Sequence, residues 1–183
     1  MKAYVSRAGE KLEFALDKFN VSVTGFTIAD FGSSTGGFVD CLLQNGANKV
    51  YSVDTSYGEL AWKLRNHPNV VVMERTNAMH VKLPEKVDLV TVDTSWTKQI
   101  MVLPNVFNNL KKDGIVISLI KPHYEAPREY LEKGRLKDEY IDEVLEKVKN
   151  DIVSVGGEVL NLIESPILGE KGKNKEFLVL ITK

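Results

Sequence analysis

The chain has 183 residues, of which 43% are hydrophobic and 27% are charged, and its formal net charge at pH 7 is −1. This composition excludes a disordered or fibrous chain. The near-neutral charge excludes a polyanion-binding surface that covers the whole molecule, so any nucleic-acid surface must be local.

We expect a single domain over residues 1–183, because the length suits one hydrophobic core and no linker divides the chain. No apolar run is long enough to cross a bilayer, and the first residues lack the apolar core of a signal peptide, which predicts a cytoplasmic protein. Cys41, the only cysteine, lies in a helical pattern and is expected to be a buried structural thiol. The histidines show no metal-ligand spacing, so we expect no metal site.

Helical and strand periods alternate along the chain. An amphipathic helix is predicted first, over residues 6–19. Further helices are predicted over residues 35–46, 58–66, 98–112 and 138–157, and strands over 27–31, 49–53, 69–74, 87–92, 114–120, 158–164 and 176–182. This order predicts a doubly wound α/β sheet of the Rossmann-like kind, with seven mostly parallel strands. The last two strands follow each other without a helix, which predicts that the final strand is antiparallel.

Long irregular segments are predicted over residues 122–137 and 165–175, and long loops in a compact domain are often functional. Both segments are basic. Around the first lie Lys121, Arg128, Lys133, Arg135 and Lys137, against Glu125, Glu129 and Glu132, and in the second lie Lys171, Lys173 and Lys175. Taken alone, each segment is better explained as a solvated charged loop.

The sequence VDTS occurs twice, at residues 53–56 and 92–95. The flanking residues do not repeat, so this is not a duplicated module. Each copy follows an apolar β-branched run, which places Asp54 and Asp93 at the ends of two strands.

The segment DFGSSTGG, residues 30–37, joins the first strand to a helix, where open α/β sheets bind ligands. A dinucleotide fingerprint would need glycine at Ser34, and a phosphate-binding P-loop would need Gly-Lys-Ser/Thr. The carboxylate of Asp30 suits a cationic amino acid moiety and would repel phosphate. Together these features favour S-adenosylmethionine over a nicotinamide cofactor.

Two further residues are candidates for the nucleoside part of this cofactor. Asp54 is placed to bond ribose hydroxyls, although it could equally cap the helix predicted at residues 58–66. Asn77 could reach the adenine edge, or could simply form a turn. The complete predicted cofactor set is Asp30, Gly32, Ser33, Ser34, Thr35, Gly36, Gly37, Phe38, Asp54, Asn77 and Asp93.

Asp93 is expected across the crevice from the first strand, where the methyl group would lie. The sequence DTSW that it begins is not the Asn/Asp-Pro-Pro-aromatic pattern of amino-group methylation. Cys41 is on the wrong element to act as the nucleophile of pyrimidine carbon-5 methylation, and metal ligands are missing. A hydroxyl acceptor remains, and a hydroxyl needs its proton oriented or removed.

Lys121, Lys11 and Glu176 are the candidates for that task. A lysine acts as a base only when its pKa falls, which desolvation, a second lysine and a sulfonium would promote. Each residue alone is better explained as a surface ion pair or a solvated strand end.

These residues lie in motifs that resemble a known family. SRAGEKL, DFGSSTGGF, VDTSYGELAWKLR, ERTNA, LIKPHYE, ESPILG and KEFLVLI are similar to the FtsJ-type 2′-O-ribose methyltransferases, most closely the TlyA/haemolysin A-like branch. The resemblance covers nearly the whole chain. It implies a catalytic tetrad, which maps by motif onto Lys11, Asp93, Lys121 and Glu176: Lys121 would orient or deprotonate the ribose hydroxyl, Asp93 and Glu176 would hold the lysines and the substrate, and Lys11 would complete the electrostatics.

The sequence departs from this branch in two places. The bacterial branch carries an N-terminal RNA-binding domain, whereas this chain starts at the catalytic helix, so we expect its grip on RNA to come from elsewhere. The residues after Asp93 are TSWTKQ instead of a VSFIS-like run, so the acceptor side is expected to read a different RNA. Trp96 could be a core residue or a base-stacking platform, and Trp62 is expected in the core.

The leading hypothesis is an S-adenosylmethionine-dependent 2′-O-ribose methyltransferase that acts on structured RNA, such as ribosomal RNA, with the two basic loops gripping phosphates. One alternative is a methyltransferase for a small-molecule hydroxyl acceptor. Another is a non-catalytic RNA-binding or ribosome assembly factor of the same fold.

Overall fold

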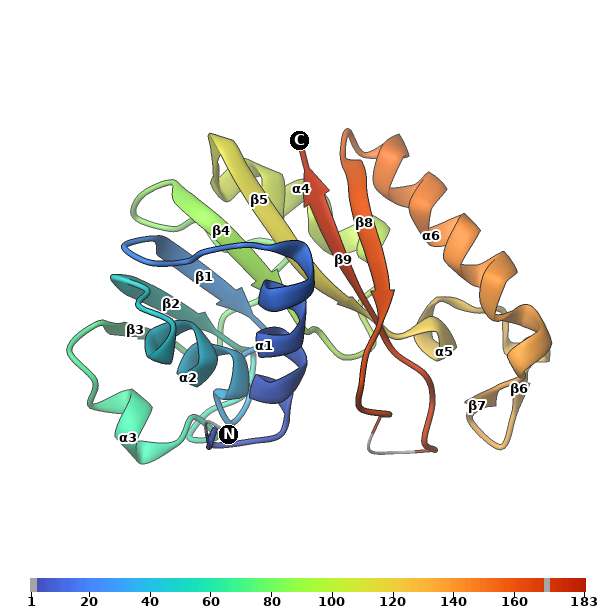
Figure 1. The fold of residues 1–183 in the computed structure, drawn as a ribbon, viewed down its shortest axis with the longest axis horizontal. Helices are drawn as coiled ribbons and strands as arrows, with labels where there is room; N and C mark the ends of the chain where they lie inside the picture. The colour runs from blue at the N-terminus through green and yellow to red at the C-terminus, as the bar shows by residue number, and fades with distance from the viewer. Residues whose placement is uncertain (1–2, 170–171) are drawn as a thin grey trace.

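The computed structural model describes residues 3–169 and 172–183, in which helices and strands alternate (Figure 1). Lys171 of the second basic loop lies outside the described residues. The helices are α1 (Ala8–Phe19), α2 (Gly37–Gln44), α3 (Trp62–Arg65), α4 (Gln99–Asn109), α5 (Pro122–Glu125) and α6 (Ile141–Ser154), with 3₁₀ turns at Arg128–Tyr130 and Asp138–Tyr140. The strands are β1 (Thr27–Phe31), β2 (Lys49–Val53), β3 (Val70–Met73), β4 (Val87–Val92), β5 (Leu110–Ile120), β6 (Leu131–Glu132), β7 (Arg135–Leu136), β8 (Glu158–Glu164) and β9 (Phe177–Thr182).

In the described part of the chain, seven strands form one sheet in the order β3-β2-β1-β4-β5-β9-β8. The strands from β1 to β5 in this sheet pair in parallel. β9 is antiparallel to both of its neighbours, β5 and β8. The predicted mostly parallel, seven-stranded sheet with an antiparallel last strand is therefore confirmed. The strand order reverses between β1 and β4, and open α/β sheets bind their ligands at such a point.

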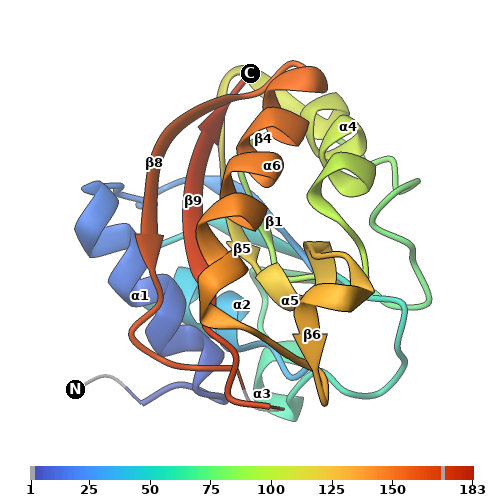
Figure 2. The ribbon, with the colours of Figure 1, turned by 90° about the vertical axis from the view of Figure 1, so that its right-hand side faces the viewer.

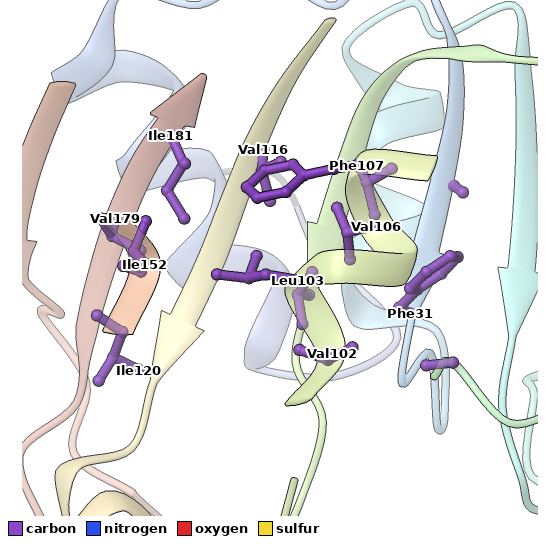
Figure 3. Packing of buried hydrophobic residues seen from close by; sticks show 14 of the residues in the cluster. Phe31, Val102, Leu103, Val106, Phe107, Val116, Ile120, Ile152, Val179 and Ile181 are labelled. Carbon is purple, nitrogen blue, oxygen red and sulfur yellow. The ribbon is translucent and has the colours of Figure 1, made fainter. Parts of the chain in front are cut away.

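The sheet is covered on both faces, with α1 and α2 on one side and α4 and α6 on the other (Figure 2). α1 forms because Leu12, Ala15 and Leu16 fall on one face and are buried, and it ends where Asn20 adopts a left-handed conformation. On the opposite face, α4 and α6 pack against alternate residues of β1, β5 and β9 (Figure 3). Cys41 is fully buried on the face of the sheet covered by α1 and α2, as expected for a structural thiol.

Two predicted helices differ from those observed. The helix predicted over residues 98–112 ends at Asn109, because Leu110 already pairs with Val87 of β4. The helix predicted over residues 58–66 is reduced to α3, in which Leu64 is buried. Trp62 lies on the outer side of this short helix and is 78% exposed, so the expectation that it belongs to the core is wrong.

The segment predicted as irregular over residues 122–137 contains α5, a 3₁₀ turn and the two-stranded hairpin β6–β7. Within residues 3–169 and 172–183, no helix combines the length and the apolar character that crossing a membrane requires.

Candidate active site

Asp54 and Asp93 follow the two strands that flank β1. The backbone fixes the ends of these strands to the loop after β1, because the Gly32 amide donates to the Val53 carbonyl at 2.8 Å and the Asp93 amide donates to the Phe31 carbonyl at 2.9 Å. The prediction that the two VDTS sequences mark strand ends is therefore confirmed. Both aspartates border the crevice at the carboxyl end of β1.

Glycine is required at two positions of the loop after β1. Gly32 has φ of +89°, and a Cβ atom there would lie 2.5 Å from the Asp93 carbonyl oxygen. Gly36 has φ of +97°, and its Cβ would lie 2.4 Å from a methyl carbon of Leu64. A side chain at Gly32 would therefore push apart the two sides of the crevice. Gly36 serves packing, since it immediately precedes α2 and its Cβ position is filled by Leu64 and Leu60.

Asp54 organises this loop through its own carboxylate. Its Oδ2 accepts a hydrogen bond from the Ser34 amide at 2.7 Å, and its Oδ1 accepts one from the Ser56 amide at 2.8 Å. The alternative interpretation of Asp54 as a helix cap is wrong, because α3 begins after Ala61 without a side-chain cap. The carboxylate lines a cavity of about 290 Å³ that lies beside the loop.

Asn77 lines the same cavity as Asp54. Its side-chain oxygen accepts a hydrogen bond from the Met79 amide at 2.8 Å, so the turn-forming alternative is observed. Within residues 3–169 and 172–183, the side-chain nitrogen of Asn77 makes no hydrogen bond, and an amide donor at this position could bond a nitrogen of a purine edge.

Asp30 is 1% exposed at the end of β1 and lines a smaller cavity of about 110 Å³ under the loop. Burial raises the pKa of its carboxyl from an ordinary value of 3.8 to about 8; a hydrogen bond from Thr91 opposes this shift, and the charges of Asp93 and Asp54 add to it. One oxygen of Asp30 accepts from the Thr91 hydroxyl at 2.7 Å, and the other is buried and has no hydrogen-bond partner in the described part of the chain. A cationic ligand group in this cavity would satisfy that oxygen and favour the ionised carboxylate.

All the residues of the predicted tetrad, Lys11, Asp93, Lys121 and Glu176, line one cavity of about 350 Å³. They form two ion pairs. Lys121 Nζ lies 2.6 Å from Asp93 Oδ1, and Lys11 Nζ donates to Glu176 Oε2. The pairs come from four elements, because α1 supplies Lys11, the ends of β4 and β5 supply Asp93 and Lys121, and Glu176 immediately precedes β9.

The pKa of Lys121 is raised above its ordinary value. Burial alone would lower this pKa, but the charge and hydrogen bond of Asp93 and the charge of Glu176 outweigh the burial. The two carboxylates therefore outweigh burial in the protein itself, and the lowering of this pKa by a sulfonium stays a prediction. Lys121 is a cation at neutral pH in this structure.

An aromatic cluster at the mouth of the cavity was only partly predicted. Trp96 is 77% exposed, and its ring centroid lies 4.7 Å from that of Tyr124. Trp96 also has φ of +64°, a left-handed conformation that is rare for a bulky residue. Because Trp96 is exposed, the core alternative for this residue is wrong. Tyr124 and the neighbouring His123 belong to the LIKPHYE motif, but their place in this cavity was not predicted. Burial and the charge of Lys121 lower the pKa of His123 to about 4.

The segment before α1 was also missed as a wall of the site. Ser6, Arg7 and Ala8 line the main cavity. The segment is held against α2 because the Val5 amide donates to the buried carboxylate of Asp40 at 2.8 Å. In the residues that the structure describes, no group of three or more His, Cys, Asp or Glu side chains could hold a metal ion.

Comparison with known proteins identifies the family. The model of the FtsJ-like methyltransferase family matches residues 4–183. The chain belongs to the FtsJ-like methyltransferase family. This family membership confirms the resemblance that the sequence motifs indicated.

Curated relatives within the FtsJ-like family match most of the chain. Hemolysin A of Brachyspira hyodysenteriae is 39% identical over 181 residues, which are 96% of this chain and 75% of that protein. The 16S/23S rRNA (cytidine-2′-O)-methyltransferase TlyA of Mycobacterium tuberculosis is 36% identical over 192 residues, with 100% of this chain and 70% of that protein covered. YqxC of Bacillus subtilis is 42% identical over 185 residues, and this chain spans 64% of its length.

Solved structures agree with the assignment of the fold. A candidate hemolysin from Streptococcus thermophilus superposes with a TM-score of 0.96 at 39% identity, covering 100% of this chain and 68% of that chain. A candidate S-adenosylmethionine-dependent methyltransferase from Listeria monocytogenes is 17% identical and gives a TM-score of 0.70 over 96% of this chain and 98% of that chain, which shows the shared fold alone.

Proposed function

We propose that residues 1–183 act as one methyltransferase domain that transfers a methyl group from S-adenosylmethionine to the 2′-hydroxyl of a ribose in RNA, with ribosomal RNA as the substrate. The observation that carries this proposal is the joining of two lysine–carboxylate pairs in one cavity, directly beside the loop after β1. The TlyA relative from Mycobacterium tuberculosis is named for this chemistry on 16S and 23S rRNA, which supports the same acceptor here. A protein that methylates ribosomal RNA would act in the cytoplasm.

The residues present fit the cofactor. Asp30, with its unpaired buried oxygen, would hold the amino group of the methionine moiety. Asp54 would bond the ribose hydroxyls through its remaining lone pairs, and Asn77 would face the adenine. The remaining predicted contacts, from Gly32, Ser33, Ser34, Thr35, Gly37 and Phe38, line the cavity beneath the loop. When bound, S-adenosylmethionine supplies an electrophilic methyl group on a positively charged sulfur.

Lys121 would then act on the acceptor hydroxyl. Its Nζ would orient the 2′-oxygen and, in its neutral form, would accept the hydroxyl proton when the methyl group moves to that oxygen and its bond to the cofactor's sulfur breaks, which would leave a neutral thioether. Asp93 holds Lys121 in place at 2.6 Å, and Glu176 pairs with Lys11. The positive charge of a bound cofactor would lower the pKa of Lys121.

Trp96 and Tyr124 would provide a stacking platform for the base of the acceptor nucleotide. Both rings line the main cavity, and stacking of one base on an aromatic side chain is worth about 1–3 kcal/mol. We predict that Trp96→Ala raises the KM for RNA roughly tenfold or more while the affinity for S-adenosylmethionine is retained. Steady-state kinetics with RNA as the varied substrate, together with calorimetric titration of the cofactor, would measure the two effects separately.

The proposed function is tested by transfer of labelled methyl from S-adenosylmethionine to purified ribosomal subunits and to deproteinised total RNA, followed by alkaline hydrolysis. A 2′-O-methyl ribose lacks the hydroxyl that alkali needs, so label is expected in alkali-resistant dinucleotides and is expected to be lost with Lys121→Ala. Label in mononucleotides would show base methylation and contradict the proposal. Absence of label in every RNA, with normal cofactor binding, would favour a small-molecule acceptor.

A further inference from the structure

We propose that the hairpin β6–β7 and residues 165–169 and 172–176 of the following loop form a single surface that binds phosphates of the RNA substrate, and that Asn174 holds its two parts together. We call this the two-turn surface. The inference rests on the proposed function, because it assigns a place on the molecule to the RNA that this function requires.

Each part of the two-turn surface ends in a tight turn that presents a lysine. Lys133 and Gly134 have φ of +48° and +80°, and Gly172 and Lys173 have φ of +71° and +50°. Two successive residues with positive φ form the kind of turn in which Asn, Asp and Gly are preferred. Both lysines are exposed, so packing does not compensate for this backbone conformation. Strained residues of this kind cluster where a ligand is bound.

Asn174 joins the two turns although they are 40 residues apart. Its side chain is 4% exposed, its oxygen accepts a hydrogen bond from the Leu136 amide at 2.9 Å, and its Nδ2 donates to the Gly134 carbonyl at 3.1 Å. The Gly169 amide in turn donates to the Asn174 carbonyl at 2.8 Å, which joins the two described parts of this segment. The two basic segments, each unremarkable alone, therefore form one continuous surface.

Between the turns lies an open hollow of about 480 Å³. It is lined by Glu132, Lys133, Arg135, Leu136, Lys137, Asp138 and Gly172. Lys133 and Lys137 make no ion pair among the described residues, whereas Arg135 pairs with Asp138 at 3.6 Å in an exposed contact that is weak in water. Lys137 Nζ also lies 6.0 Å from the centroid of the Tyr140 ring. Cations without an acidic partner suit a phosphate backbone, whose binding requires charge and not a shaped apolar pocket.

The two-turn surface adjoins the main cavity through the loop itself. Gly169 and Glu176 of this loop line the main cavity, while Gly172 lines the hollow. The hairpin and the loop also lie at the end of the sheet where the parallel strands finish (Figure 1). An RNA strand with its acceptor ribose in the main cavity could therefore place neighbouring phosphates on the two-turn surface.

The test replaces both turn lysines by asparagine, in the double variant Lys133→Asn/Lys173→Asn. Asparagine is favoured in the left-handed conformation, so the turns keep their geometry while two charges are removed. Binding of a fluorescently labelled RNA hairpin of about 30 nucleotides is measured by anisotropy between 50 and 300 mM salt. We expect affinity to fall about tenfold at 150 mM salt, and the slope of log affinity against log salt to become shallower by about 1–2.

The matched control is Lys82→Asn/Lys112→Asn. It removes two exposed lysines at the other end of the sheet, where β4 and β5 begin. It should bind the hairpin as wild type does. An unchanged salt slope in the turn variant, or an equal loss in the control, would overturn the proposal. Cofactor affinity and kcat at saturating RNA should be retained in both variants, so a failure of the two-turn surface is distinguishable from a failure of the proposed function, in which wild type itself methylates no RNA.

Asn174→Ala tests whether the two turns act as one surface. This variant keeps every cation but removes the bonds to Leu136 and Gly134. We expect the affinity for the RNA hairpin to fall about as far as in the lysine variant, with the cofactor affinity retained. Wild-type RNA affinity in Asn174→Ala would show that the two turns bind independently, and the proposal would be wrong.

Discussion

Lys121 is both the proposed proton acceptor and a cation at neutral pH. Asp93 lies 2.6 Å from its Nζ and, with Glu176, raises its pKa against the effect of burial. A lysine can accept a proton only when it is neutral. Only a small fraction of the protein is therefore ready for transfer at neutral pH unless the charge of the cofactor lowers this pKa.

We predict that the rate of methyl transfer at saturating substrates rises with pH, by up to tenfold per pH unit from 7 until the pKa of Lys121 is reached. The measurement is a pH–rate profile in single-turnover conditions. Lys121→Arg is the control, since arginine stays charged and should be slow and insensitive to pH. A flat wild-type profile between pH 7 and 9 would mean that Lys121 only donates a hydrogen bond.

The buried carboxyl of Asp30 leads to a second prediction, which concerns how the stability of the fold depends on pH. Burial raises the pKa of its carboxyl from 3.8 to about 8, so between these values the folded state binds a proton that the unfolded state has released. The contribution of Asp30 is therefore favourable at low pH and is lost as pH rises from about 4 to about 8. Asp30→Asn should raise the Tm by several degrees at pH 8.5 and have little effect near pH 4. Thermal unfolding followed by circular dichroism at both pH values measures this, and an equal change at both would contradict the raised pKa.

At the scale of elements, the loop after β1 depends on the absence of a side chain at Gly32. Its Cβ would meet the backbone of Asp93 at 2.5 Å, whereas Gly25, which also has positive φ, has nothing within 4 Å of its Cβ position. Gly32→Ala should therefore weaken cofactor binding at least tenfold and lower the free energy of unfolding by about 2–3 kcal/mol. Gly25→Ala should cost only about 1 kcal/mol and leave cofactor binding intact. Calorimetric titration and urea unfolding of both variants would show the difference, and similar results for the two would refute a steric role for Gly32.

The sequence predicted an element well wherever its hydrophobic period ended at a residue typical of loops. The strands that carry Asp30, Asp54 and Asp93 are bounded by loop residues, so their ends were predicted closely. The boundary between α4 and β5 was not, because Leu110 continues the helical pattern and is drawn into the sheet only by pairing with Val87. The hairpin β6–β7 was missed because each strand has only two residues, too few for an alternating pattern.

For the candidate site, the sequence predicted which residues take part but not their ion pairs or the pKa of Lys121. The ion partners of Lys11 and Lys121 could not be predicted from local sequence, since Lys11 and Glu176 are 165 residues apart, and only the family resemblance brought them together. The raised pKa of Lys121 was likewise missed, because the balance between burial and neighbouring charges depends on distances that the sequence does not contain.

At the scale of the whole molecule, the pair formed by Lys11 and Glu176 fastens the first helix to the last strand. Both side chains are buried, so Lys11→Ala leaves an unpaired carboxylate and should lower the free energy of unfolding by about 3 kcal/mol. Lys111→Ala breaks the pair with Asp88, in which the lysine is half exposed, and should cost less than about 1 kcal/mol. Urea unfolding compares the two, and Lys11→Met/Glu176→Gln should recover stability but not methyl transfer. Equal costs for the two alanine variants would show that the buried pair does not join the molecule's ends.

The position of β9 sets an order of events during synthesis. β9 is inserted between β5 and β8, and among the described strands it is the only partner of β8. A ribosome makes β8 first, so this strand must wait unpaired until residues 177–182 have emerged. Glu176 arrives at the same moment, which makes the active site the last part of the fold to be completed. A nascent chain that stops before Glu176 therefore lacks one member of the proposed tetrad and leaves β8 without its partner strand.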